Sequence, residues 1–129
     1  MLSMSNEEIF DILDVVLKAA EAAKSRAEHI IHKDQITGNF ESETLFDAIC
    51  MNFVVIGENL KMLDNKTQGQ YLKKYSDIPW SEVIRMRDIV AHHYTGIKNE
   101  IIFDTVKRDI PDLITILRIM LEDLKTDNQ

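Results

Sequence analysis

The sequence predicts an all-α fold, and three observations support this prediction. Leu, Ile, Val and Met dominate the apolar residues, and the chain holds only four Gly and two Pro. No stretch of alternating β-branched residues is bounded by turn residues, as a strand would be. With 129 residues, the chain has the length of one domain that can bury a core. We therefore expect a single helical domain over residues 1–129.

The first long helix is predicted to begin after Ser5 and to continue to about His32. Ser5 and Glu8 have the spacing of a capping box, which marks a helix start. A loop that contains Gly38 and Asn39 is expected to follow. Apolar residues recur at helical intervals along the predicted helix, at Ile9, Ile12, Leu13, Val16, Ala20, Ala23, Ala27 and Ile30.

The second helix is predicted from about Ser42 to Asn65, and it is unusually apolar from Ala48 to Ile56. A helix in a two-layer bundle buries only one stripe of its surface, so apolar residues on nearly every face call for a further partner. The surplus lies around Ile49, Phe53, Val54 and Ile56. It predicts a two-fold homodimer.

The rest of the chain predicts one short helix and two long ones. The short helix is expected near Tyr71 to Lys74, and a third principal helix from Pro79 to about His92 or His93. The last helix would run from Asn99 to about Lys125, with a kink at Pro111. Four principal helices with short connections predict an antiparallel bundle. The last helix would face inward with Ile102, Val106, Ile110, Leu113, Leu117, Met120, Leu121 and Leu124.

Charge and cysteine content limit the classes of partner and the compartment. The formal net charge is −7, from 22 acidic and 15 basic side chains, so RNA could bind only at a local basic patch. The single cysteine, Cys50, cannot form an internal disulfide, which suits a reducing compartment. No signal-peptide pattern opens the chain, and no run of ~20 apolar residues could span a bilayer. We expect a cytoplasmic protein that does not enter a membrane.

The segment IRMRDIVAHHYTGI, at Ile84–Ile97, holds the candidate site. Arg87 is permanently charged and can bind a phosphate through two N–H groups, while His92 can exchange protons near neutral pH. On a helix, Asp88 and His92 share a face, so Asp88 can orient the imidazole. Tyr94 returns to nearly the same face as Arg87. An Arg and a His at this spacing are weakly specific by themselves, and a helix-end salt bridge with Asp88 is an alternative reading.

These residues would suit cleavage of RNA without a metal ion. Attack by a ribose 2′-OH requires that one proton be removed from that hydroxyl and another be given to the leaving 5′-oxygen. A two-fold dimer would supply two histidines for these transfers. Arg87 would stabilise the charge that grows on the phosphorane oxygens. The expected products carry a 2′,3′-cyclic phosphate and a 5′-hydroxyl.

Three motifs in order resemble the HepT-type toxins of the HEPN superfamily. They are IGENLKML at Ile56–Leu63, IPWSEVIRMRD at Ile78–Asp88, and the pattern Arg, four residues, His, any residue, Tyr at Arg87–Tyr94. The similarity covers nearly the whole chain. It implies a HEPN-like helical homodimer that acts as a metal-independent endoribonuclease without a cofactor. It also implies a type VII-like toxin–antitoxin pair with a nucleotidyltransferase antitoxin of the MNT type.

The resemblance assigns roles to the motif residues. It implies that Arg87 and His92 are catalytic, that Asp88 is the usual polar residue after the arginine, and that Tyr94 accepts AMP from the antitoxin. His93 is also present, and six residues separate Arg85 from His92, so other pairs satisfy a looser spacing. The His-x-Tyr register favours His92, with His93 in a supporting role.

Several alternatives stay open at the level of sequence. The chain could be a noncatalytic helical module that binds and regulates a nucleotidyltransferase, or could serve mainly as the substrate of that enzyme. Glu58 and Asp47 could line the site, but pairing with a neighbouring cation and a helix-dipole role, respectively, are the simpler readings. Trp80 is expected to be a packing anchor. His29 and His32 lack a third ligand, so no metal site is expected.

Overall fold

Five helices make up the computed structural model, which describes residues 4–29, 40–93 and 99–127, without the side chains of residues 89, 91–93, 99 and 127. No strand occurs in these ranges, so the predicted all-α class is confirmed. None of the described helices is both long enough and apolar enough to cross a membrane. The helices are α1 (Asn6–Ala27), α2 (Phe40–Lys66), α3 (Gln70–Lys73), α4 (Trp80–His93) and α5 (Asn99–Asp127).

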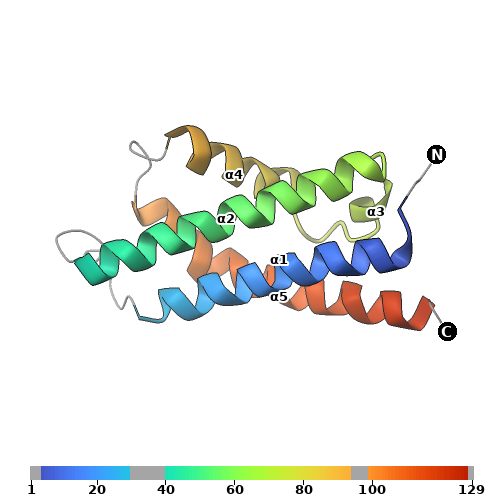
Figure 1. Ribbon diagram of the computed structural model, residues 1–129, viewed down its shortest axis with the longest axis horizontal. Coiled ribbons are helices and arrows are strands. Elements are labelled where there is room, and N and C mark those ends of the chain that lie inside the picture. The colour runs from blue at the N-terminus through green and yellow to red at the C-terminus, as the bar shows by residue number, and fades with distance from the viewer. Residues whose placement is uncertain (1–3, 30–39, 94–98, 128–129) are drawn as a thin grey trace.

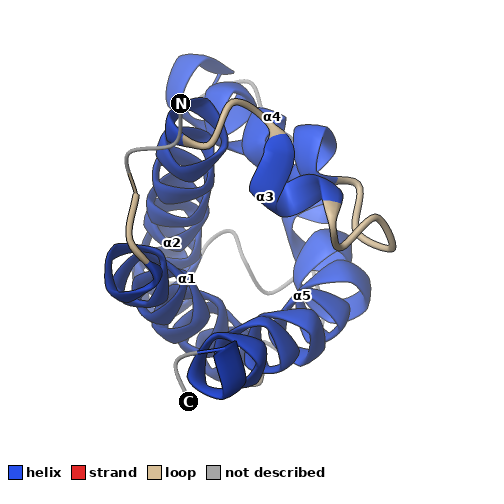
Figure 2. Ribbon diagram, turned by 90° about the vertical axis from the view of Figure 1, so that its right-hand side faces the viewer, coloured by secondary structure: helices blue, strands red, loops and turns tan. Residues whose placement is uncertain are grey.

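The four long helices form an antiparallel bundle in which α1 and α2 are the central pair. Helix α1 packs against α2 and α5, whereas α4 packs against α2 and makes few contacts with α5. Figure 1 shows each long helix running opposite to the neighbour on which it packs. In the end-on view of Figure 2, α4 and α5 lie on the same side of the bundle. The short helix α3 packs near the end of α2 (Figure 1).

Helix α1 begins as predicted and ends earlier than predicted. Ser5 Oγ accepts a hydrogen bond from the Glu8 backbone N–H at 3.1 Å, and the Glu8 carboxylate accepts one from the Ser5 N–H at 3.4 Å. The expectation that the helix continues to about His32 is wrong, because it ends at Ala27. There the Glu28 N–H is shared between the Lys24 and Ser25 carbonyls, a tightened turn that often ends a helix.

The apolar residues of α2 from which the sequence predicts a homodimer lie inside the single chain. Ile49, Phe53 and Ile56 are buried in the core of the single chain, and Val54 is half-buried. These residues are therefore not the surplus apolar surface that the sequence was expected to present. The reason is geometric, because α2 packs against both α1 and α4 and so buries two of its faces.

Two residues at the start of α4 behave as the sequence predicts. Pro79 lies directly before the helix and its carbonyl accepts from the Glu82 and Val83 N–H groups at 3.0 and 3.1 Å. Trp80 is buried, and its indole Nε1 donates to the Tyr75 carbonyl at 2.7 Å. Trp80 is thus a packing anchor, and its hydrogen bond to Tyr75 ties the segment before α4 to the start of that helix.

Helix α5 packs along α1 and buries one apolar face. All eight residues that were predicted to face inward are buried. Pro111 lies within the helix, where it cannot donate a hydrogen bond to the Lys107 carbonyl. Figure 1 shows the orange first part of α5 running at an angle to its red last part, as a proline inside a helix would cause.

Candidate functional site

Helix α4 carries most of the residues that the sequence singled out. Arg87 and Asp88 lie in its second half, and the helix continues through His92 and His93. The side chains of both histidines lie outside the described part of the structure, and so does the whole of Tyr94. The convergence of Arg87, His92 and Tyr94 therefore stays a prediction.

Two carboxylates hold the Arg87 side chain. Its Nη1 donates to Asp88 Oδ1 at 2.5 Å, and its Nη2 forms an ion pair with Glu58 of α2. The Arg87 side chain is 25% exposed, so both pairs sit at the edge of solvent and are only partly screened. The hydrogen bond that Arg87 donates to Asp88 has the largest effect on the pKa of the guanidinium and raises it above its usual value. Burial lowers this pKa, and the contact with Glu58 raises it further. Arg87 thus stays charged, and its position is fixed from two helices.

A glycine in α2 allows the close approach that brings Arg87 to Glu58. Gly57 is buried against α4, and a Cβ atom placed on it would lie 2.1 Å from Arg87 Cβ and 3.2 Å from the Ile84 carbonyl oxygen. Real Cβ atoms do not approach that closely. Glycine inside a helix costs about 1 kcal/mol relative to alanine. The helix contact at Arg87 therefore depends on a residue that is unfavourable for α2 itself.

Glu58 is the site residue whose partner sequence reasoning did not identify. The predicted pairing of Glu58 with a neighbouring cation is confirmed, and this cation is the candidate catalytic Arg87. The available signal was Gly57 directly before it, since an isolated glycine in an apolar helix often marks a close approach. Asp47 is exposed and lies eleven residues before Glu58, about 16 Å along the helix. Asp47 is therefore too far along α2 to contact Arg87 as Glu58 does.

Asp88 contacts Arg87 through its carboxylate. Its predicted contact with His92 stays a prediction, because the His92 side chain lies outside the described part of the structure. A carboxylate has two oxygens and about four acceptor sites, so this contact does not prevent a second one. Arg85, the alternative arginine, is exposed, and its position is about 200° around the helix from that of Arg87. The two arginines thus face opposite sides of α4.

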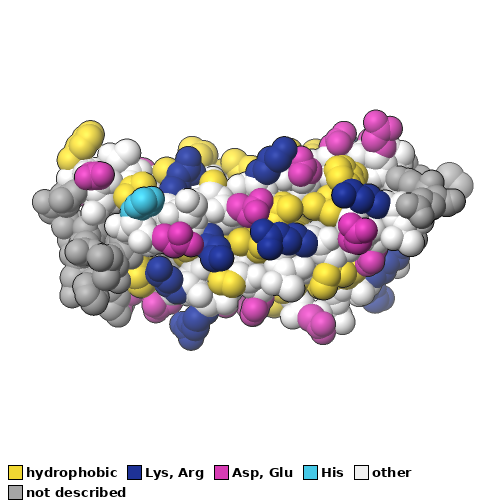
Figure 3. Space-filling model, turned by 90° about the horizontal axis from the view of Figure 1, so that it is seen from below, with side chains coloured by type: hydrophobic (Ala, Val, Ile, Leu, Met, Phe, Trp, Pro, Cys, Tyr) yellow, Lys and Arg dark blue, Asp and Glu magenta, His cyan; other side chains and the backbone are white. Residues whose placement is uncertain are grey.

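The charge around Arg87 restricts what the site can bind. Its single positive charge stands beside two negative ones, and its Nε–H is buried without a hydrogen-bond partner among the described residues. A phosphate would have to compete with Glu58 or Asp88 for the guanidinium. Figure 3 shows basic and acidic side chains intermixed on the face formed by α1 and α5, so the described residues form no continuous basic patch on that face.

Comparisons with known proteins agree with the motifs. The model of the family described as "Ribonuclease HepT-like" matches residues 16–120. The chain is 31% identical over 103 residues to a Thermococcus cleftensis protein named "Probable ribonuclease HepT", covering 80% of this chain and 86% of that protein. It is 30% identical over 101 residues to a candidate RNase of Caldanaerobacter subterraneus subsp. tengcongensis, covering 78% and 83%.

One further relative is much longer than the matched region. It comes from Methanocaldococcus jannaschii, is named a gamma-glutamylcyclotransferase and candidate RNase, and is 39% identical over 90 residues. The match covers 69% of this chain and 39% of that protein, whereas a match to a second protein of the same organism, a candidate RNase, covers 64% of each. No solved structure matches this chain significantly. Because the family model spans most of the bundle, including α2 with Glu58 and α4 with Arg87, the chain belongs to the HepT-like ribonuclease family.

Proposed function

We propose that this protein is a metal-independent endoribonuclease whose phosphate-binding group is Arg87. The observation that carries this proposal is the fixing of Arg87 between Glu58 and Asp88 at a helix contact that only glycine permits. A prepositioned cation at a partly dry helix contact is what stabilisation of a phosphorane requires. The ribonuclease names of the relatives support the same class of reaction.

The proposed reaction forms one bond and breaks another at the same phosphorus atom. The ribose 2′-oxygen attacks phosphorus while a histidine takes its proton, and the bond to the 5′-oxygen breaks while a second histidine protonates it. His92 is the proposed proton carrier, and His93 supports it. The products are a 2′,3′-cyclic phosphate and a 5′-hydroxyl. No cofactor takes part in this scheme.

Glu58 and Asp88 would hold Arg87 in place until substrate binds. The phosphodiester of RNA can offer its two non-bridging oxygens to the guanidinium, as a carboxylate offers its oxygens. Because both carboxylates remain close by, the site would bind phosphate weakly before the reaction and gain most when charge increases in the transition state. Because Arg87 would then bind the transition state more tightly than the bound substrate, it would raise the rate of cleavage more than the affinity for RNA.

A homodimer is proposed because the reaction needs two proton transfers and each chain supplies one copy of the Arg87–His92 motif. Among the described residues, α2 leaves a stripe of large apolar side chains exposed, with Phe40 85% and Met51 60% exposed, and Met62 on the same line. These residues lie within about 40° of one another around the helix, and Glu58 falls on the same stripe. A second copy that covered this stripe would approach the Arg87 site, so that two copies of His92 could serve one phosphate.

Control by a nucleotidyltransferase of the MNT type, as the antitoxin of a toxin–antitoxin pair, is the proposed regulation. AMP on Tyr94 would add a bulky anion a few residues from Arg87, where it would obstruct the site and compete for the guanidinium. Tyr94→Phe should keep cleavage and lose protection by the antitoxin with ATP. A Tyr94→Phe protein that is still protected through transfer of AMP would contradict this assignment.

The test of the nuclease is incubation of total RNA in EDTA with purified wild type, Arg87→Ala and His92→Ala. Arg85→Ala is the matched control, because Arg85 lies on the same helix but faces away from the site. Wild type and the control should cut RNA, and the other two variants should lose the activity while keeping their helicity. Folded wild type that carries no AMP and cuts nothing would favour the second candidate function.

That second candidate is a noncatalytic helical module that binds and regulates a nucleotidyltransferase. The two carboxylates on Arg87 favour it, because they offset the positive charge that an RNA phosphate would seek. In that case Arg87→Ala would weaken the complex with the nucleotidyltransferase, and purified protein would leave RNA intact.

A further inference from the structure

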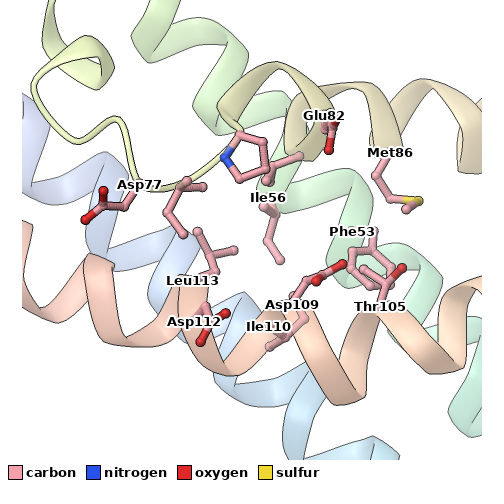
Figure 4. Close-up of a pocket in the computed structure, with 13 residues that line it drawn as sticks. Phe53, Ile56, Asp77, Glu82, Met86, Thr105, Asp109, Ile110, Asp112 and Leu113 are labelled. Atoms are coloured by element: carbon pink, nitrogen blue, oxygen red, sulfur yellow. The ribbon is translucent and has the colours of Figure 1, made fainter.

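A pocket of about 220 Å³ lies between α2, α4 and α5, away from the Arg87 site. Its floor is apolar and is formed by Phe53, Ile56, Ile110 and Leu113, with Met86 at one side (Figure 4). The pocket exists because α4 and α5 both pack on the central helices but make few contacts with each other. A cavity of roughly 150 Å³ is enough to bind benzene, so this pocket has room for one large apolar side chain.

Carboxylates surround this apolar floor. Figure 4 shows Glu82 of α4 on one side, Asp109 and Asp112 of α5 on the opposite side, and Asp77 at one end. All four are exposed, and none forms a hydrogen bond or ion pair with another described residue. No Lys or Arg is found among the described residues that line the pocket.

The nearby cations of α5 are directed to other partners. Arg108 lies 4.0 Å from Asp104, one turn earlier, and Lys107 Nζ lies 5.4 Å from the centre of the Phe103 ring. Among the described residues, no Lys or Arg forms an ion pair with the four carboxylates around the pocket. The floor of the pocket is apolar and the four carboxylates around it are negative. Together they favour a ligand that is apolar at its centre and positive at its edges.

We infer that this pocket binds a segment of a partner protein, namely an amphipathic helix with one large apolar side chain flanked by Lys or Arg. The apolar side chain would fill the pocket, and the cations would pair with the carboxylates on its two sides, as in other helix-in-groove contacts. A second copy of this chain fits less well, because a symmetric contact would place the same acidic rim against itself.

The pocket and the Arg87 site lie on different faces of α4. Met86 lines the pocket, and Arg87, the next residue, is turned by about 100° toward Glu58 of α2. A partner segment in the pocket would therefore leave the guanidinium accessible. The inference is independent of RNA cleavage, and its test contains no RNA.

The test is titration of the whole protein with a short helical peptide that carries one Leu flanked by Lys residues on the same side of the helix. Two peptides of the same length, with Glu in place of Lys and with Ser in place of Leu, serve as probes of charge and apolar contact. Calorimetry should show one Leu/Lys peptide bound per chain, weakened by added salt, and no binding of the other two. Failure of the Leu/Lys peptide to bind would overturn the inference.

Two variants locate the peptide. Thr105→Arg, on the pocket wall, should abolish binding because it fills the pocket with a cationic side chain. Asp109→Asn with Asp112→Asn should weaken binding about 2- to 25-fold, as expected for the loss of two exposed ion pairs. Asp11→Asn with Glu122→Gln, two exposed carboxylates outside the pocket, is the charge-matched control and should change affinity less than twofold.

Two results would contradict the inference even if a peptide bound. Binding that the pocket variants leave unchanged, or that the control weakens equally, would show that general negative charge attracts the peptide. A lower sedimentation mass of the free Thr105→Arg protein than of wild type would show that a second copy occupies the pocket. Circular dichroism of each variant confirms that the fold is retained.

Discussion

Gly57 shows how a single residue positions the candidate site. We predict that Gly57→Ala lowers the free energy of unfolding by about 1–3 kcal/mol, because the new Cβ meets Arg87 Cβ at 2.1 Å and overpacks the contact of α2 with α4. The gain of roughly 1 kcal/mol in helix propensity works in the opposite direction. Urea denaturation measures the change.

A double-mutant comparison identifies the atoms responsible. Arg87→Ala keeps the Cβ and should not recover the stability lost in Gly57→Ala, whereas Arg87→Gly removes the Cβ and should recover part of it. A Gly57→Ala protein that is more stable than wild type would contradict the close approach of the two helices.

Cys50 provides a second prediction at the residue scale. Burial, and then the nearby charge of Asp47, raise the pKa of its thiol to about 12. At pH 8 roughly one thiol in ten thousand is then ionised, so the folded protein should react very slowly with a disulfide reagent. The rate should increase about tenfold per pH unit toward the pKa. Rapid labelling at pH 8 without denaturant would contradict the burial of Cys50.

The chemistry of single residues could be predicted from sequence, but their contacts could not. Arg87 was identifiable because its charge and its spacing to His92 are local properties of the chain. Its pairing with Glu58, 29 residues earlier, depends on how closely α2 approaches α4, and local sequence does not specify that distance. The ion pair of Asp88 with its immediate neighbour Arg87 is the alternative that the sequence offered, and it needs no knowledge of how the helices pack.

At the scale of elements, the start of α1 is fixed by both hydrogen bonds of a capping box. We predict that Ser5→Ala costs about 0.5–2 kcal/mol, because it removes the side-chain acceptor for the Glu8 N–H. Ser25→Ala, at an exposed position inside α1, is the control and should be neutral or slightly stabilising. Equal effects of the two changes in urea denaturation would show that the capping box contributes nothing.

Helix order and the buried faces followed from periodicity, because burial of an amphipathic stripe is a local pattern. The C-terminal end of α1 did not, since apolar residues continue at helical spacing to Ile30 while the helix ends at Ala27. The burial of Ile49, Phe53 and Ile56 within one chain was also missed. A sequence shows that a helix has two apolar faces, but not whether the second one meets α4 or another molecule.

At the scale of the whole molecule, association of two chains is the proposal to test. We predict that Met51→Lys converts a dimer into monomers in sedimentation experiments, because Met51 lies at the centre of the exposed apolar stripe of α2. Ile119→Lys, at an exposed apolar position on α5, is the matched control and should leave the mass unchanged. A monomeric wild type, or loss of association in the control alone, would contradict the α2 interface.

Attack by the 2′-hydroxyl can be tested by cleavage of a single RNA in EDTA, compared with cleavage of the same RNA carrying one 2′-deoxynucleotide at the mapped cut. Wild type should cut the first RNA to leave a cyclic phosphate and should spare that position in the second, while Arg87→Ala cuts neither. Cleavage at the deoxynucleotide, or equal cleavage by Arg87→Ala, would contradict attack by the 2′-hydroxyl at a site centred on Arg87.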